Sequence, residues 1–298
     1  MKRERLAEIG SGIIEIGNGN WLKEREKGET WYKRLGWQEI EELEKMVELQ
    51  SLVWEMPVRE AVPSNFLAVA EDTGGAVIAS YNKDGEMNGM SFTVGTIFNK
   101  LILHMVGVDR ENRYVNDLGR DMCLLQGMLA REKGVDRIDW TYDPLLGANA
   151  RLYIEKLGAW PYLYTVNKYG RVPSDLYGES PTDRFTVRWD IGNPVVWSHV
   201  CDGDLEPLSL MDIDGLPVID VTDLKKVERD RFLVQIPGVA ENVVDVDKWR
   251  MGLRKVALVT MDWQADRDFG VGTHLVSGFA SGMINGDRRN YYVFSRKI

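Results

Sequence analysis

Apolar residues recur at helical spacing in three long segments of the chain. In residues 38–54 one face carries isoleucine, leucine, methionine and valine, whereas glutamates crowd the opposite face. Residues 118–133 and 247–263 repeat this division into an apolar and a polar face. Pro57 follows the first segment and Gly134 the second, and both residue types commonly end helices. The sequence therefore predicts amphipathic helices over these three ranges.

Shorter apolar runs bounded by turn residues are typical of β-strands. Residues 101–108 form a nearly continuous apolar run, which is expected of a central strand covered on both faces. The Asn-Lys-Asp-Gly sequence at residues 82–85 and the Asn285-Gly286 pair have the composition of hairpin turns. The predicted strands are residues 12–16, 31–35, 76–81, 88–94, 101–108, 137–142, 162–167, 184–189, 231–236, 274–283 and 291–296, and two shorter helices are predicted at residues 63–70 and 146–157.

This alternation predicts an α/β fold, an α+β arrangement around a mixed sheet, and it divides the chain into regions. Residues 1–29 mix charges with glycines and are expected to form an N-terminal extension with one short strand. Residues 30–190 are expected to form the main domain. Gly192-Asn-Pro194 has the composition of a linker, and residues 195–298 are predicted to form a smaller C-terminal α+β module.

The 298-residue chain has a net charge of −9, and most of it lies in one segment. Between Cys201 and Asp247, twelve Asp and Glu residues oppose four Lys and Arg residues, a local balance of −8, so the remainder is close to neutral. Such a segment repels phosphate backbones, and we expect no nucleic-acid partner. Either it attracts a cationic substrate or it forms an acidic solvated surface.

Cysteine content and hydropathy narrow the class of protein further. Cys123 and Cys201 provide neither a disulfide framework nor a metal-ligand spacing, so we expect no bound metal. No segment approaches the roughly 18 consecutive apolar residues of a membrane helix, and the N-terminus lacks the apolar core of a secretory signal. These features predict a cytoplasmic protein without a membrane partner.

Two short motifs point to a family. Residues 140–145 read Trp-Thr-Tyr-Asp-Pro-Leu, and residues 181–184 read Pro-Thr-Asp-Arg. Together with the strand–polar loop–helix–strand–helix order of residues 101–157, they resemble the acyl-CoA-binding half of the GCN5-related N-acetyltransferase (GNAT) superfamily, in the branch that carries both motifs. The resemblance covers residues 30–190 and is weaker beyond them.

The resemblance implies a GNAT-like acyl-CoA N-acyltransferase fold and its chemistry. The implied reaction transfers an acyl group from acyl-CoA to the amine of a small molecule or an amino acid. Acetyl is the default acyl group, with succinyl or another short acyl group as the alternative. Acyl-CoA is then a co-substrate, and no metal takes part. The resemblance is also compatible with a homodimer.

In this family the pyrophosphate of coenzyme A binds main-chain N–H groups at a helix N-terminus, where the helix dipole also favours an anion. Of the family's glycines, Gly119 alone remains here, and Asp117 stands where another is expected. Its carboxylate opposes a pyrophosphate by on the order of 1 kcal/mol, so the alternative role for Asp117 is a plain helix cap. The residues that the resemblance assigns to coenzyme A in this loop are Arg113, Tyr114, Val115, Asn116, Leu118, Gly119 and Arg120.

The strand before this loop is the second implied contact with acyl-CoA. In the family it diverges from the next strand, which by position leaves the main-chain groups of Val106, Gly107 and Val108 for the pantetheine arm and the thioester carbonyl. A donor directed at the developing oxyanion stabilises the tetrahedral intermediate. His104 is expected on the same side of the strand as Val106 and Val108, as either a general base or a packed core residue.

Asn149 and Tyr153 lie four residues apart on one predicted helix and therefore share a face. The resemblance places this helix along the arm of coenzyme A and gives a tyrosine the task of protonating the leaving thiolate. Counted back from Gly158, however, the family's tyrosine position falls on Ile154, so Tyr153 is one residue early. Tyr153 is therefore a candidate general acid, with packing or contact with coenzyme A as the alternative.

Three charged residues in the two motifs are further candidates. Asp143 precedes a proline and is either a helix cap or a catalytic carboxylate. Asp183 and Arg184 either pair structurally or contact the substrate. Two rival functions remain open: a non-catalytic acyl-CoA or ligand-binding protein with the same fold, and a structural protein with a vestigial cleft.

Overall fold

The computed structural model describes residues 12–25, 28–113, 117–174, 180–202, 207–219, 229–238, 246–261 and 272–297. The chain divides into two compact units. The first comprises Met1–Trp140, Pro173–Gly178 and Asp190–Asp204. The second comprises Thr141–Val172, Glu179–Trp189 and Leu205–Ile298.

A sheet forms the centre of the first unit. Neighbouring strands from β1 to β6 pair in antiparallel fashion, each with the next in the sequence, whereas β6 and β7 are parallel. The strands are β1 (Ile13–Gly17), β2 (Asn20–Arg25), β3 (Gly28–Leu35), β4 (Ala76–Tyr81), β5 (Met87–Gly95), β6 (Leu101–Val108) and β7 (Ile138–Tyr142), the last of which continues into the second unit.

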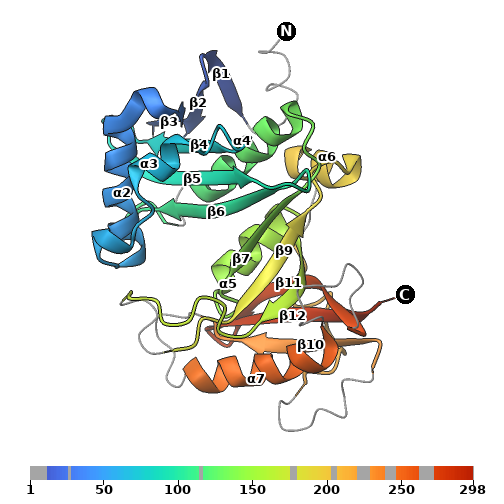
Figure 1. The fold of residues 1–298 in the computed structure, drawn as a ribbon. Coiled ribbons are helices and arrows are strands. Elements are labelled where there is room, and N and C mark those ends of the chain that lie inside the picture. The colour runs from blue at the N-terminus through green and yellow to red at the C-terminus, as the bar shows by residue number, and fades with distance from the viewer. Residues whose placement is uncertain are drawn as a thin grey trace. The chain divides into compact units, whose positions relative to one another are not determined.

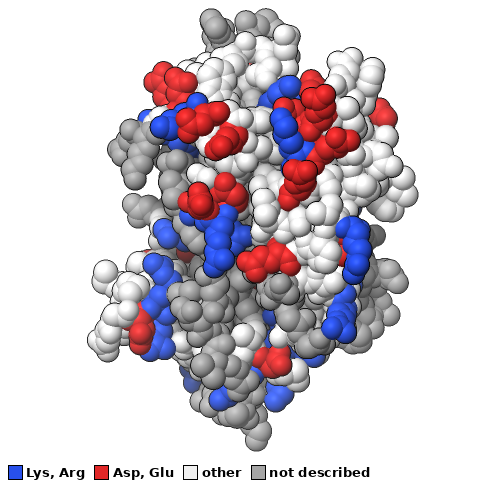
Figure 2. Space-filling view, turned by 90° about the vertical axis from the view of Figure 1, so that its left-hand side faces the viewer, with Lys and Arg blue, Asp and Glu red and all other residues white. Residues whose placement is uncertain are grey.

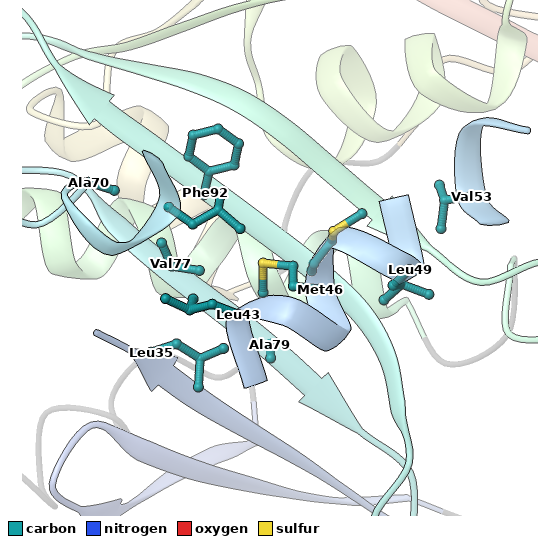
Figure 3. Packing of buried hydrophobic residues seen from close by; sticks show 11 residues of the cluster. Leu35, Leu43, Met46, Leu49, Val53, Ala70, Val77, Ala79 and Phe92 are labelled. Atoms are coloured by element: carbon teal, nitrogen blue, oxygen red, sulfur yellow. The ribbon is translucent and has the colours of Figure 1, made fainter. Parts of the chain in front are cut away.

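Two layers of helices cover the faces of this sheet (Figure 1). On one face α2 (Ile40–Trp54) and α3 (Ser64–Ala68) pack on alternate residues of β4 and β5. Figure 3 shows Leu43 and Met46 of α2 beside Val77 and Phe92 of the sheet. On the other face α4 (Leu118–Glu132) packs its apolar side on β1 to β4. Because side chains alternate along a strand, one set of strands supplies both cores.

Helix α6 (Pro194–Asp202) completes the first unit against α4. Arg120 donates a hydrogen bond to the carbonyl of Val200 at 2.6 Å, and the guanidinium of Arg131 lies 4.7 Å from the ring centre of Trp197. Two arginines on one helix therefore hold a segment that follows it by more than sixty residues in the sequence.

A buried carboxylate ties the N-terminal strands to the first turn of α4. Asp121 is fully buried and accepts hydrogen bonds from Lys23 at 2.8 Å, from Arg25 at 2.5 Å and from the hydroxyl of Tyr32 at 2.8 Å. An acidic residue also suits the N-terminal turn because the helix dipole is positive there. Strands β2 and β3 therefore help to fix where α4 begins.

The second unit combines the end of β7 with elements from the C-terminal part of the chain. A second sheet has the strand order β10-β12-β11, with both pairs antiparallel. The elements are α5 (Gly147–Ala150), a π-helix (Arg151–Lys156), β8 (Trp160–Thr165), β9 (Arg184–Trp189), β10 (Arg231–Ile236), α7 (Val246–Thr260), β11 (His274–Ile284) and β12 (Asp287–Arg296).

A tyrosine pair joins the Trp-Thr-Tyr-Asp-Pro-Leu segment to the C-terminal sheet within this unit. The hydroxyl of Tyr292 donates to the carbonyl of Pro144 at 2.7 Å and lies 3.1 Å from the hydroxyl of Tyr142. The ring of Phe185 stands edge-on to Tyr292, with ring centres 5.3 Å apart. Buried tyrosines need such partners for their hydroxyls, so this contact fixes the segment as well as filling the core.

The predicted α/β class with a mixed sheet is confirmed, and most predicted elements are found within a few residues of their expected bounds. Among the strands and α-helices of the described residues, two were missed. Strand β2 falls in the segment expected to hold one short strand, and α6 follows the segment predicted as a linker. The helix predicted at residues 146–157 forms as an α-helical turn followed by a π-helix.

Candidate functional site

The candidate site of the first unit begins where β6 and β7 part. These parallel strands pair only at Leu101 with Ile138 and at Ile102 with Asp139, and no further pairing between them occurs in the described part of the chain. On its other edge β6 pairs with β5 from Leu101 to Val108. The outer edge of β6 from Leu103 onward therefore presents main-chain groups that β7 does not use.

The direction of each peptide group on this edge follows from the alternation of an antiparallel pair. The N–H of Asp109 donates to the carbonyl of Asn88 at 3.0 Å, so the groups of Asp109 face β5. Two residues earlier, Gly107 faces β5 as well, whereas Val106 and Val108 face the open edge. Arg113 donates to the carbonyl of Val108 at 3.3 Å. Val106 thus offers both its N–H and its carbonyl on the open edge.

Gly107 has a packing role on the face of the sheet. A Cβ atom at this position would lie 2.8 Å from Cη2 of Trp54 and 3.0 Å from Cγ1 of Val53. The absence of a side chain admits the last turn of α2 against β6. The end of α2 therefore lies over the strand that bears the open edge.

A β-bulge changes the orientation expected for His104. The register passes from Phe92 with Met105 to Thr93 with Leu103, so His104 is the extra residue of β6. Its ring stands edge-on to Phe92 with centres 5.0 Å apart, on the face covered by α2 and α3. Val106 and Val108 pack toward α4. The prediction that His104 shares their side is wrong, because simple alternation does not hold across a bulge.

His104 is exposed at the position where β6 leaves β7. Its partial removal from water lowers its pKa below the ordinary value of 6.5. The imidazole is therefore neutral at pH 7. A neutral imidazole with access to solvent can accept a proton from an amine, which is the property that a general base requires.

The loop after β6 leads into α4 through a residue in the left-handed region. Asp117 has φ 53° and ψ 32°, and its carbonyl accepts the N–H of Asp121 at 3.1 Å. A glycine adopts this conformation without strain, and Asp does so more readily than most residues. Asp117 therefore meets the conformational requirement of the missing glycine. Leu118 and Gly119 form the first residues of α4, and Tyr114, Val115 and Asn116 lie outside the described residues.

Both arginines predicted to bind the pyrophosphate hold main-chain carbonyls. Arg113 donates to the carbonyls of Val53 and Val108, which joins the loop to α2 and β6. Arg120 donates to the carbonyl of Val200, as described above. Each guanidinium has five N–H donors, so these bonds leave donors for a ligand. Their assignment to coenzyme A stays a prediction.

The remaining predicted residues lie in the second unit. Asn149 lies half-buried on α5, and Tyr153 is buried with its ring edge-on to Tyr142 at 5.3 Å between centres. In the π-helix the N–H of Leu157 bonds the carbonyl of Leu152, five residues earlier, at 3.1 Å. A π-helical turn takes up one more residue than an α-helical turn. The role of Tyr153 as general acid stays a prediction.

Asp143 is bound from two directions. Its carboxylate accepts a hydrogen bond from the N–H of Leu145 at 3.0 Å. It also accepts bidentate hydrogen bonds from the guanidinium of Arg250 at 3.2 and 2.9 Å. Arg184 approaches the same carboxylate at 3.7 Å. Both oxygens are engaged within a buried cluster, so this geometry favours a structural role over direct catalysis. Asp143 is not the predicted helix cap, because α5 begins after Leu146.

The Pro-Thr-Asp-Arg motif holds the residues that follow β8 next to the start of β9. Asp183 is fully buried and accepts hydrogen bonds from Tyr164 at 2.5 Å, from the N–H of Asn167 at 2.9 Å and from Arg254 at 2.8 and 2.7 Å. Burial acts to raise the pKa of Asp183, but these bonds outweigh it and the pKa is lowered. Asp183 therefore pairs with Arg254, while Arg184 donates to the carbonyl of Asp183 at 2.9 Å.

Glu155 on the π-helix was not singled out from the sequence. Its side chain is buried, one carboxylate oxygen has no hydrogen-bond partner, and the other lies 3.3 Å from Nε of Arg151. Burial raises the pKa of Glu155 to about 7, against the opposing charges of Arg151 and Lys156. A helical spacing of Arg and Glu usually indicates a surface pair, so this burial could not be predicted from the sequence.

The charge and hydropathy of the described residues bear on metal binding and on membrane-spanning helices. On the face in Figure 2, lysine and arginine side chains lie among aspartate and glutamate side chains. Within the described ranges, no group of three or more His, Cys, Asp and Glu side chains could hold a metal ion. No described helix is both long and apolar enough to cross a membrane.

Comparison with known proteins gives a likeness in fold. An acetyltransferase of the GNAT family from Staphylococcus aureus Mu50 is 15% identical, with a TM-score of 0.38, and covers 54% of this chain and 99% of its own. The ribosomal-protein-S18-alanine N-acetyltransferase from Escherichia coli is 14% identical, with a TM-score of 0.43, covering 55% and 95%. PaiA N-acetyltransferase from Thermoplasma acidophilum, solved with coenzyme A, is 14% identical, with a TM-score of 0.40, covering 54% and 98%.

The chain resembles GNAT acetyltransferases in fold. The likeness covers about half of the length of this chain. No protein-family model matches the sequence, and no curated protein matches it. The GNAT likeness therefore concerns the arrangement of strands and helices, and the chemistry has to be argued from the residues.

Replacement of Glu155 by Gln tests its buried carboxylate. The pKa is raised in the folded state, so the contribution of the protonated form is complete below the ordinary value of 4.5 and is lost as the pH rises through about 7. At pH 8 we expect Glu155→Gln to be more stable than the natural protein by on the order of 2–3 kcal/mol, and near pH 4.5 we expect no difference.

Urea unfolding at several pH values between these limits measures the effect. Glu48→Gln is the matched control, because Glu48 is exposed on α2. A stability difference for Glu155→Gln that does not change with pH would contradict the assignment.

Proposed function

We propose that this chain is a GNAT-like acyl-CoA-dependent N-acyltransferase that acts on the amine of a small molecule or an amino acid. The observation that carries the proposal is the open outer edge of β6, where Val106 presents an N–H and a carbonyl beyond the point at which β7 departs. An extended amide chain such as pantetheine can pair with such an edge as a strand would. The likeness to acetyltransferase folds, one of them solved with coenzyme A, agrees with it.

In the proposed reaction the amine nitrogen attacks the thioester carbon. The N–H of Val106 donates to the oxyanion that develops on the carbonyl oxygen. His104 accepts the proton that the amine loses, the carbon–sulfur bond breaks, and the departing thiolate takes up a proton. The products are an N-acylated acceptor and coenzyme A, and the transferred group is acetyl or another short acyl group.

The N-terminus of α4 supplies the proposed site for the diphosphate of coenzyme A. The first N–H groups of a helix lack partners within the helix, and the dipole adds a partial positive charge. Arg113 and Arg120 add two formal charges near this turn. The negative charge of Asp117 opposes these two positive charges and weakens the attraction for the diphosphate. This favours the second candidate function, a protein that binds acyl-CoA without catalysing acyl transfer.

Replacement of His104 by Gln separates these two functions. If His104 is the general base, kcat falls by roughly 10²–10⁴-fold while the dissociation constant of acetyl-CoA is unchanged. In the natural protein kcat should fall as the pH drops through the lowered pKa of His104. In the variant this decrease of kcat at low pH should be absent.

Thiol release from acetyl-CoA with a panel of amines measures the rate, and calorimetric titration measures binding. His199→Gln on α6 is the control, since no role is proposed for that histidine. Binding of acetyl-CoA without thiol release for every amine would support the non-catalytic function instead.

Two replacements of Asp117 test the diphosphate site. Asp117→Asn removes the charge and keeps tolerance of φ 53°, whereas Asp117→Gly also removes the left-handed strain. We expect both variants to bind coenzyme A about five- to tenfold more tightly, because a repulsion of on the order of 1 kcal/mol is removed. Dephospho and shortened pantetheine analogues without the diphosphate should show no gain. Equal gains for those analogues would place the diphosphate elsewhere.

A further inference from the structure

Three rings contact one another on the face of the sheet that α2 and α3 cover. The ring of Phe92 stands edge-on to His104, with centres 5.0 Å apart, and the ring of Phe66 stands edge-on to Phe92, with centres 6.4 Å apart. Figure 3 shows Phe92 among the buried apolar residues of this face. Phe92 is 2% exposed, whereas Phe66 is 48% exposed and His104 is also exposed. Two accessible rings therefore flank a buried one.

Further apolar side chains lie on the same face. Val69 follows Phe66 by three residues, at the end of α3, and is 45% exposed. Val94 is half-buried and packs against the core of this face. It pairs directly with Ile102 of β6, which is also half-buried, and directly opposite residues of two antiparallel strands share a face. We call Phe66, Val69, Val94 and Ile102 the apolar surface.

The chain segments that carry the apolar surface have no formal charge. Residues 61–70, which contain α3, residues 87–98, which contain β5, and residues 101–108 of β6 include no Asp, Glu, Lys or Arg. A second ionised group on a ligand would therefore lose water here without gaining an ionic partner from these segments. A hydrocarbon group would instead gain free energy by covering exposed apolar side chains.

We propose that the acceptor amine carries an uncharged apolar group, aromatic or aliphatic, which packs on Phe66 next to His104. The inference rests on the proposed function, because the proton transfer to His104 is what brings the amine to this face of β6. The rest of the acceptor then meets the apolar surface. Phe66 is in this arrangement a specificity-determining residue. Within the acceptors proposed above, the surface selects simple apolar amines over polyamines and over amino acids with a free carboxylate.

A series of amines with one carbon chain tests this selection on the full-length protein. Hexylamine, hexamethylenediamine and ε-aminocaproate differ in the group at the far end of the chain, and phenethylamine adds an aromatic ring. Thiol release from acetyl-CoA gives kcat/KM for each amine. We expect the values for hexylamine and phenethylamine to exceed those for the diamine and the amino acid by roughly tenfold or more.

Replacement of Phe66 tests its part in the selection. Phe66→Ala should lower kcat/KM for phenethylamine by roughly tenfold relative to that for ethylamine, mainly through KM, because the contact with an accessible aromatic side chain is lost. A ratio of two kcat/KM values from one preparation does not depend on how much of the protein is folded. Phe66→Leu should keep most of the preference. Leu52→Ala is the control, because Leu52 is an exposed apolar residue of α2 without a role in the site.

Ligand-observed NMR with coenzyme A present measures binding of the same amines. Thiol release that is equal for all amines, faster with the diamine or the amino acid, or indifferent to Phe66→Ala would overturn the inference and leave the acyltransferase function in place. Phe66-dependent binding of the apolar amines without thiol release would support the apolar surface and reject the acyltransferase function. Absence of both binding and thiol release would reject both. Self-association that Phe66→Ala abolishes, without binding of any amine, would assign the surface to a second copy of the chain and overturn the inference as well.

Discussion

The proposed function depends on a strand that is paired along its whole length on one edge and only at its start on the other. Strand β6 is bonded to β5 along its length, and β7 leaves it after Ile102. Main-chain N–H and carbonyl groups without partners cost free energy wherever water cannot reach them. A ligand with amide groups can satisfy them in the way a strand would. The bulge at His104 and the contact of α2 with Gly107 both lie on this strand, so the residue proposed as the base and the last turn of α2 lie next to the open edge.

Buried carboxylates position the elements around this edge and around the second motif. Asp121 links β2 and β3 to the first turn of α4, whereas Asp143 and Asp183 link α7 to the two motifs. Each has at least one arginine partner, which offsets the cost of burying a charge. Glu155 is different, since one of its oxygens has no partner and its pKa is raised. Its pKa of about 7 means that its protonation changes with pH near neutrality.

The sequence predicted the elements whose periodicity is regular. The apolar face of α2, the continuous run of β6 and the hairpin of β11 and β12 are encoded locally, and they form as expected. Strand β2 carries charged residues and no alternation, so its pairing with β1 and β3 decides its structure. A one-residue bulge at His104 and a π-helix at Tyr153 leave no mark in the hydrophobic pattern, although the bulge turns His104 to the face of the sheet that carries Phe92.

Partners that are distant in the sequence account for the rest of what was missed. Arg250 and Arg254 are four residues apart and therefore lie on one face of α7, which the sequence shows. Their partners Asp143 and Asp183 are 107 and 71 residues away, which it does not show. The same holds for Lys23 and Asp121, which are 98 residues apart. Consequently the motifs could be located from the sequence. Which of their side chains have structural partners could be seen only in the folded structure.

A crystal structure of the protein with acetyl-CoA would examine the open edge most directly. The account predicts that the pantetheine arm lies along β6, with the thioester oxygen roughly 3 Å from the nitrogen of Val106. It also predicts the diphosphate at the first turn of α4. Coenzyme A bound away from β6, with the outer edge of that strand covered by the protein's own side chains, would contradict it.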